Sequence, residues 1–339
     1  MLEVAPGIYQ LILPNPPQAT PRYVNAYLVR GNNGYLLIDT GWEEKALVSL
    51  QKQLTKIGIG FKDIEQVVIT HAHPDHYGLA GRLKQLSGAK LALHYLETGV
   101  IESKFKNEYE VLSQLDQWWL VNGVPATKLT EFREGFLENK TDPIVPVLPD
   151  VTLHGSETIS NGIFNFQVLW TPGHSAGHIS LYEPEQKILF SGDHILPNIY
   201  TNIGIALLPP EQSQNPLGDY LNSLNEIKHL EVDLILPGHG NRFVDLKGRV
   251  EKIIKHHKYR TAEIIRAIEV TAKTTYQIAA ELTWRPATKG AGWQDLDLWG
   301  QRLSVAETAA HLELLRFNGK ADKFIGNSIV YYHLVDTAK

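Results

Sequence analysis

Cysteine is absent from the 339 residues of this sequence. Its absence excludes disulfide bonds, sulfur ligands to a metal and a thiol nucleophile. Long apolar runs are missing too, because no stretch approaches the roughly 18 consecutive apolar residues of a membrane span. The first six residues, Met-Leu-Glu-Val-Ala-Pro, lack the basic and apolar regions of a secretory signal. We therefore expect a cytoplasmic protein that does not interact with membranes.

The sequence also lacks a large excess of charge of either sign. Its 32 Lys and Arg residues against 37 Asp and Glu residues give a formal net charge of -5. Such a balance provides no general attraction to nucleic acid. What the chain does have is 43% hydrophobic residues, enough to bury a sizeable core. Its length predicts one large domain and a smaller one.

Histidine and aspartate are concentrated between residues 71 and 76, in the order His-Ala-His-Pro-Asp-His. This hexad follows the apolar segment 67–70 directly. Imidazole and carboxylate groups suit a hydrolytic zinc, and a strand that ends in a tight loop can direct all four side chains to one point. The hexad therefore predicts a metal site, although a solvated loop or a structural metal knot would use the same residues.

Three further segments place histidine or aspartate directly after an apolar run. The loops are Thr-Pro-Gly-His, which ends at His174, Ser-Gly-Asp-His, which contains Asp193, and Pro-Gly-His-Gly, which contains His239. Catalytic residues commonly lie in loops at the ends of buried strands, where a rigid sheet positions them. We therefore expect all four segments to converge on a single site.

The ordered His and Asp residues of these segments resemble the metallo-β-lactamase superfamily of metal hydrolases, over roughly residues 1 to 245. The resemblance implies an α/β fold, an αβ/βα sandwich of two mixed sheets with helices outside and the metals at one edge. It implies two zinc ions, although iron or manganese suits the same donors. The implied ligands are His71, His73 and His174 for one ion, Asp75, His76 and His239 for the other, and Asp193 as the bridge between them.

Two metal ions about 3.5 to 4 Å apart lower the pKa of a shared water and stabilise charge on the oxygen under attack. Asp75 could orient the resulting hydroxide, and His194 could donate a proton to the leaving group. The resemblance places Asp39 as the acceptor of an imidazole N–H behind the ligands, although an Asp before Gly also suits a turn. It gives His178 a supporting or structural position. The Pro-rich segment 14–21 either flanks the site or is an ordinary crossover.

Differences from relatives narrow the expected reaction. The best-known zinc β-lactamases use a Cys or no carboxylate where Asp193 stands, and the diiron flavoprotein branch has a Glu at the position of His73. The pattern is most similar to the glyoxalase II-like branch. We therefore expect a thioesterase-like, zinc-dependent hydrolase in which a metal-bridging hydroxide attacks a thioester, ester or lactone carbonyl. A metal-binding protein without activity is one alternative, which the intact ligand set disfavours.

Residues 97–147 form a predicted helical insertion within the catalytic domain, residues 1–245. Apolar residues recur there at steps of three and four, which gives a helix with one apolar face. Trp119 lies on this face and Trp118 lies beside it. We hypothesise that the insertion is a lid whose Trp118 and Trp119 contact an apolar or acyl part of a small-molecule substrate. The alternative is that the apolar face only docks the insertion on the sandwich.

Residues 246–339 are predicted to form a linker helix and a winged-helix-like domain. Ser304 and Glu307 suit the start of a helix that reaches Phe317, and Gly326-Asn327 suits a hairpin turn. This order resembles the C-terminal winged helix of some lactamase-like hydrolases. It raises a second possibility, a phosphodiesterase or ribonuclease that uses the same metals. Because the helix at 304–320 has no net charge, a role in homodimer packing or in shaping the cleft is favoured over nucleic-acid binding.

Overall fold

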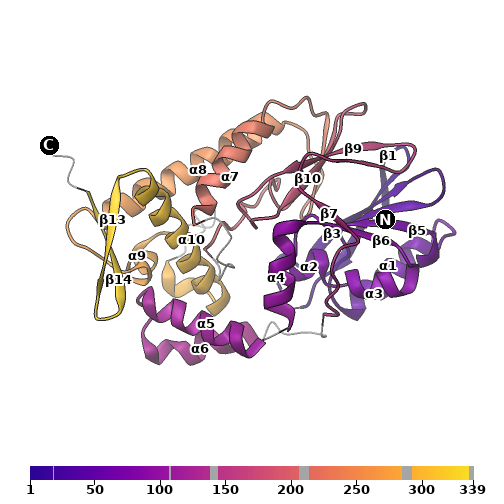
Figure 1. The fold of residues 1–339 in the computed structure, drawn as a ribbon. Helices are drawn as coiled ribbons and strands as arrows, with labels where there is room; N and C mark the ends of the chain where they lie inside the picture. Colours follow the sequence, from indigo (N-terminus) through magenta and orange to yellow (C-terminus); the bar gives the residue numbers. More distant parts are fainter. Residues whose placement is uncertain (18, 107, 138–143, 206–213, 285–291, 336–339) are drawn as a thin grey trace. The chain divides into compact units, whose positions relative to one another are not determined.

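The computed structural model describes residues 1–17, 19–106, 108–137, 144–205, 214–284 and 292–335. The chain divides into two compact units (Figure 1). The first unit contains Met1–Lys106, Thr141–Thr201 and Ser223–Val250, and the second contains Asn107–Lys140, Asn202–Asn222 and Glu251–Lys339. The division after residue 245 remains a prediction. The observed units group most of segment 97–147 with the C-terminal part of the chain.

The first unit contains a mixed sheet of seven strands in sequence order. Its strands are β1 (Leu2–Ala5), β2 (Ile8–Pro14), β3 (Tyr23–Arg30), β4 (Tyr35–Ile38), β5 (Ile64–Val68), β6 (Lys90–His94) and β7 (Val151–Leu153). Pairs from β1 to β4 are antiparallel, and pairs from β4 to β7 are parallel. The parallel strands therefore end at the same edge of the sheet.

A second mixed sheet has five strands in the order β12-β11-β10-β9-β8. Its strands are β8 (Thr158–Ser160), β9 (Asn165–Trp170), β10 (Ile179–Glu183), β11 (Ile188–Gly192) and β12 (Leu234–Pro237). Strands β11 and β12 pair in parallel, whereas the other neighbours are antiparallel. Every residue of β10 and β11 is buried, as expected for central strands covered on both faces.

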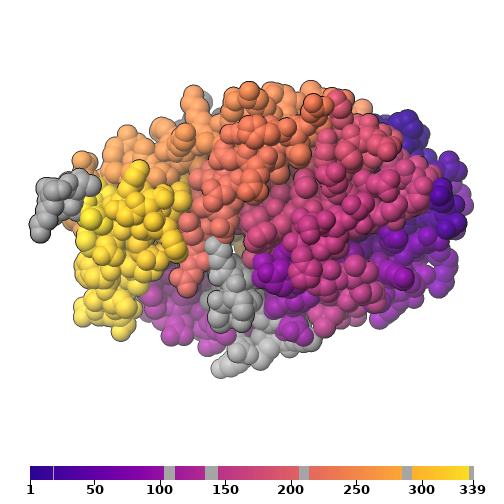
Figure 2. Space-filling model, turned by 45° about the horizontal axis from the view of Figure 1, so that its top comes forward, coloured from indigo at the N-terminus to yellow at the C-terminus, as the bar shows by residue number. Residues whose placement is uncertain are grey.

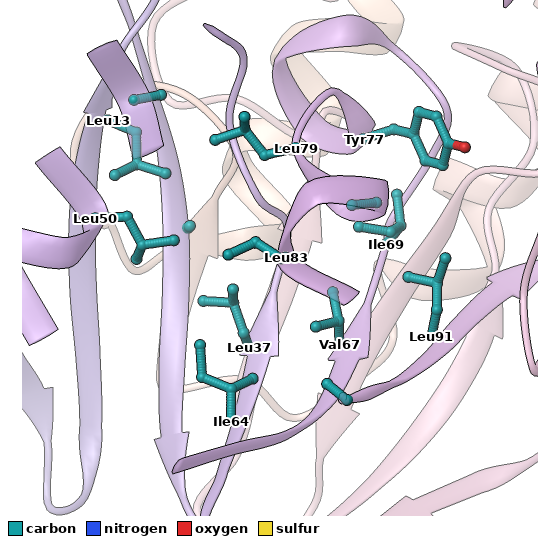
Figure 3. Packing of buried hydrophobic residues seen from close by; sticks show 14 of the residues in the cluster. Leu13, Leu37, Leu50, Ile64, Val67, Ile69, Tyr77, Leu79, Leu83 and Leu91 are labelled. Carbon is teal, nitrogen blue, oxygen red and sulfur yellow. The ribbon is translucent and has the colours of Figure 1, made fainter. Parts of the chain in front are cut away.

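Helices cover one face of the seven-stranded sheet. They are α1 (Glu43–Thr55), η1 (Phe61–Asp63), α2 (Pro74–Tyr77), α3 (Ala80–Ser87) and α4 (Tyr95–Lys106). Figure 3 shows Leu50 of α1 and Leu83 of α3 directed toward Leu37, Ile64 and Val67 of the sheet, in one buried cluster. Because successive side chains of a strand point to opposite faces, the sheet can bury a second set of residues on its other side.

The other face of that sheet packs against the five-stranded sheet. Tyr27 and Val29 of β3 share a buried cluster with Phe166 of β9 and Phe190 of β11. The Tyr27 ring meets that of Phe190 edge-on, with centroids 5.2 Å apart. The predicted α/β architecture of two mixed sheets with outer helices is therefore confirmed.

The second unit is mainly helical. Its elements are α5 (Glu108–Val121), η2 (Ala126–Lys128), α6 (Leu129–Leu137), α9 (Thr275–Glu281), η4 (Trp293–Asp295), α10 (Leu298–Phe317), β13 (Ala321–Gly326) and β14 (Ile329–Leu334). Helices α7 (Pro216–Ile227) and α8 (Leu246–Ala267) each have residues in both units. Figure 2 shows the β13–β14 hairpin, in yellow, at the surface, where Ile325 is 75% exposed.

Two predicted boundaries in this unit were wrong. Helix α10 begins at Leu298, because Asp297 caps it by accepting a hydrogen bond from the Gly300 N–H at 2.7 Å. Ser304 therefore lies inside the helix, where its hydroxyl donates to the Gly300 carbonyl. The hairpin turn is at Asn327-Ser328, both with positive φ, as two-residue turns of twisted hairpins require. In the described residues, no helix is long and apolar enough to cross a membrane.

Candidate metal centre

Four loops of the first unit carry the residues predicted as metal ligands. The hexad 71–76 follows β5, and its His73 is the N-cap of the short helix α2. His174 follows β9, Asp193 follows β11 and His239 follows β12. Because hydrogen-bonded strands of both sheets hold these loops, the positions at which the side chains leave the backbone are fixed. The structure brings the four loops together, and three groups of their side chains have donor atoms within 4.8 Å of one another.

The first group consists of His71, His73 and His174. The Nε2 atoms of His71 and His174 each lie 2.9 Å from Nδ1 of His73. Burial, and next the neighbouring His76, lowers the pKa of His71 well below its usual value. Its neutral form is therefore favoured, which is the form that binds metals. Three imidazole nitrogens thus converge as one ion requires.

The second group consists of Asp75, His76 and His239. Nε2 of His239 lies 3.3 Å from one carboxylate oxygen of Asp75, and Nε2 of His76 lies 3.9 Å from the other. Burial lowers the pKa of His239, but the carboxylates of Asp193 and Asp75 outweigh burial and raise the pKa to about 10. These donors therefore attract positive charge, which a bound proton or a metal ion can supply.

Asp193 faces both groups. Its Oδ2 lies 3.6 Å from Nε2 of His174 and 3.3 Å from Nε2 of His239, and its Oδ1 lies 3.4 Å from Nε2 of His76. Gly238 makes this approach possible, because a Cβ atom there would lie 2.4 Å from Oδ1 of Asp193. One carboxylate is therefore within reach of donors from each group.

Two buried polar atoms of this cluster indicate which kind of ligand its donor atoms can hold. Among the described residues, Nε2 of His76 and Oδ1 of Asp193 are buried without a hydrogen-bond partner. Leaving such polar atoms without a partner costs free energy. A cation between them would satisfy both, and imidazole with carboxylate is a donor set typical of divalent transition metals. The residues therefore fit a metal centre.

Asp39 and His178 support the cluster from behind. Asp39, directly after β4, accepts a hydrogen bond from the Thr70 N–H at 2.8 Å, and its other oxygen lies 2.7 Å from Nδ1 of His76. Nε2 of His178 accepts a hydrogen bond from the Asp193 N–H at 3.1 Å. Contacts of this kind fix the orientation of a metal-binding side chain. Their functional roles stay predictions.

Asn15 also belongs to this site, although the sequence did not predict it. Asn15 donates a hydrogen bond from Nδ2 to Oδ2 of Asp75 at 3.1 Å, and another to the carbonyl oxygen of Pro21. Asn15 of the Pro-rich segment therefore flanks the donor group, in agreement with the first of the two alternatives for this segment. Nothing in the sequence around Asn15 marks this contact, because its partner lies 60 residues further along the chain.

His194 does not join the donor groups. It is fully buried, and its Nε2 lies 3.2 Å from the Ser223 hydroxyl. Burial, and next His174, lowers its pKa to about 3. An imidazole held neutral in this way is a poor general acid at neutral pH, which argues against the hypothesis that His194 protonates a leaving group.

The two predicted substrate contacts, Trp118 and Trp119, lie in the second unit. Trp119 is 2% exposed and meets the ring of Phe132 edge-on, with centroids 5.4 Å apart. The Arg302 guanidinium lies over the Trp119 ring, 5.0 Å from its centroid. These contacts favour a packing role for Trp119 within the core of its own unit.

Known proteins share both the motif and the fold of this chain. The sequence profile of the metallo-beta-lactamase superfamily matches residues 19–239. The chain belongs to this superfamily. The match runs through all four loops and ends at His239 itself, the last donor of the second group. Superfamily membership, together with the His and Asp cluster, makes the protein a metal-binding hydrolase.

Individual relatives extend the similarity beyond the motif. The chain is 28% identical over 318 residues to the probable metallo-hydrolase YqjP of Bacillus subtilis, covering 91% of this chain and 92% of the relative. It is 29% identical over 230 residues to the human acyl-coenzyme A thioesterase MBLAC2, covering 65% and 74%.

Solved structures match both units of the chain. A metallo-beta-lactamase family protein from Thermus thermophilus superimposes with a TM-score of 0.79 at 28% identity, covering 98% of this chain and 100% of that one. A beta-lactamase domain protein from Burkholderia ambifaria gives a TM-score of 0.81 at 25% identity, covering 98% and 94%. The second unit therefore has counterparts in these superfamily members.

Proposed function

We propose that this protein is a dinuclear hydrolase of the glyoxalase II-like branch that cleaves thioesters, with esters and lactones as related substrates. The observation that carries the proposal is the Asp193 carboxylate, which lies within 3.6 Å of His174 in one donor group and 3.3 Å of His239 in the other. A carboxylate shared between two complete groups suits two ions. A single structural ion would need only one group.

The predicted ligands form two sets, one for each ion. His71, His73 and His174 would hold one ion, and Asp75, His76 and His239 would hold the second. Two ions there, zinc by preference and iron or manganese as alternatives, would supply an activated water and polarise the substrate carbonyl.

Orientation at this site comes from hydrogen bonds within the chain. Asp39 fixes the His76 ring through Nδ1, so that Nε2 points toward Asp75 and Asp193. Asn15 holds one oxygen of Asp75 by donating a hydrogen bond to it. The carboxylate of Asp75 is thereby held in place to orient the attacking water. A serine or cysteine nucleophile is not needed.

A thioester is the favoured substrate because of the similarity to an acyl-coenzyme A thioesterase. This class of substrate is a small molecule with an acyl part. The order α8, α9, α10, β13, β14 supports a winged-helix-like module in residues 246–339. Helix α10 has only buried or partly buried residues between Gly300 and Arg316, so its middle offers little surface for a nucleic-acid groove. This burial argues against the phosphodiesterase alternative.

A parallel activity screen tests the proposal. The metal-loaded protein would be assayed on an acyl-coenzyme A thioester, an aryl ester, a lactone, a phosphodiester and single-stranded RNA. We expect thioester hydrolysis to dominate, to stop when a chelator removes the metal, and to return with zinc. His239→Ala should abolish it, whereas the matched change of the exposed His229 to Ala should not. Dominant phosphodiester cleavage would overturn the proposal.

A further inference from the structure

A buried glutamate outside the predicted ligand set lies between two of the ligand loops. Glu97 is the third residue of α4 and is only 1% exposed. It belongs to the first unit, although it begins the segment predicted as an insertion. Its carboxylate contacts two main-chain N–H groups and one hydroxyl beside the proposed ligands.

The contacts of Glu97 join the hexad to the loop of His174. Oε2 accepts a hydrogen bond from the Ala72 N–H at 2.8 Å, between His71 and His73. Oε1 accepts from the Ser175 hydroxyl at 2.6 Å and from the Gly177 N–H at 2.8 Å.

We propose that Glu97 is a positioning residue that holds the two loops of the His71, His73 and His174 group in register. This inference rests on the proposed function. The three imidazoles of the group come from segments about one hundred residues apart, as the 101-residue separation of His73 and His174 shows. One carboxylate that accepts hydrogen bonds from both segments fixes the distance between them. Two ligand loops held in this way need less reorganisation to bind an ion.

The two acceptor oxygens of the side chain are essential to this role. An ionised carboxylate only accepts hydrogen bonds, so both oxygens can receive main-chain N–H groups. A glutamine has nearly the same shape, but its NH₂ group must face a donor on one of the two loops. Glycine at position 177 is what lets this loop come so close, because a Cβ there would lie 2.7 Å from Cγ of Glu97. Glu97→Gln therefore releases one loop while it preserves the packing.

The test compares Glu97→Gln with a matched buried glutamate. Glu183 is 2% exposed, lies at the end of β10 and accepts a hydrogen bond from the Gln186 N–H, away from the ligand loops. Metal stoichiometry and affinity would be measured by competition with a chromogenic chelator. We expect Glu97→Gln to lower the affinity for one of the two ions about 10- to 100-fold. Glu183→Gln should leave both affinities unchanged. Thermal unfolding of the metal-free proteins separates this effect from loss of folding.

A second variant covers the case in which Glu97→Gln does not fold. Ser175→Ala removes one of the three hydrogen bonds to Glu97 and should lower the affinity for the same ion by a smaller factor. Unchanged affinity in both variants, or an equal loss in Glu183→Gln, would overturn the role of Glu97. If the wild-type protein binds two ions and the variants bind them with the same affinity, only this inference is refuted. Failure of the wild-type protein to bind two ions would refute the proposed function as well.

Discussion

The change Gly238→Ala tests whether Asp193 and His76 are held where a shared metal ligand must be. Gly238 has an ordinary backbone conformation, so alanine introduces no strain of its own. Its Cβ atom would lie 2.4 Å from Oδ1 of Asp193 and 2.8 Å from Cε1 of His76, whereas ordinary contact begins at 3.4 Å. The loop cannot retreat, because its N–H donates to the Gly192 carbonyl and its own carbonyl accepts from the Asn25 N–H. Asp193 must therefore move by about 1 Å.

A displacement of this size has a predictable cost. Misplacing a reacting group by about 1 Å can reduce turnover about 100-fold, which is about 2.7 kcal/mol of transition-state stabilisation. Because Asp193 faces both donor groups, we expect Gly238→Ala to lower the affinity for both ions. We also expect it to lower kcat/KM about 100-fold. Thioester hydrolysis and metal content after dialysis measure the two effects.

The chain provides a matched glycine for comparison. Gly60 also has a negative φ, and a Cβ atom there would meet nothing within 4 Å. Gly60→Ala should therefore retain wild-type metal content and kcat/KM. If Gly238→Ala behaved in the same way, the close approach of Gly238 to Asp193 would not limit the site, and the reasoning from this geometry would be refuted.

Three further changes test other parts of the structure. Asp193→Ala should remove or scramble both ions, because its carboxylate faces both groups; two ions retained after gel filtration would contradict this. Tyr27→Phe should lower the free energy of unfolding by about 1 kcal/mol, because its buried hydroxyl donates to the Pro237 carbonyl at 2.7 Å; an unchanged urea midpoint would count against it. Burial lowers the pKa of His257 to about 3, so its contribution to stability is full above about pH 6.5 and is lost as pH falls toward 3. Between pH 7 and 5 this residue should therefore lower the free energy of unfolding by about 2 kcal/mol. Urea unfolding at the two pH values should show a loss smaller by that amount in His257→Gln than in the wild-type protein.

Sequence patterns were sufficient to expect the convergence of the four ligand loops. Each of His174, Asp193 and His239 lies within four residues of the end of a strand, and few side-chain types other than His and Asp can serve as hydrolytic metal ligands. A strand end and a ligand type are both local properties, so they can be read without the fold. The two mixed sheets followed from the family resemblance that these residues carry.

Other parts of the structure depend on partners that a local pattern does not contain. Glu97 and Asn15 reach the ligand loops through partners at least 25 residues away, and neither belongs to a motif. Periodicity correctly placed Trp119 on the apolar face of α5, but periodicity does not identify what that face contacts, substrate or protein. Its neighbours include Phe132 and Arg302 of the same unit. The start of α10 was misplaced because two acceptable capping sequences compete, and the one at Asp297 prevails.

The wide spacing of the donor residues along the chain has a consequence for the order of folding. The hexad leaves the ribosome early, whereas His239 is near the end of the first unit and is positioned only when β12 pairs with β11. A chain that has not yet formed this last parallel pair has an incomplete donor set, and such non-local pairings form slowly. Nascent chains would therefore hold metal weakly, and tight metal uptake would mark a finished sandwich.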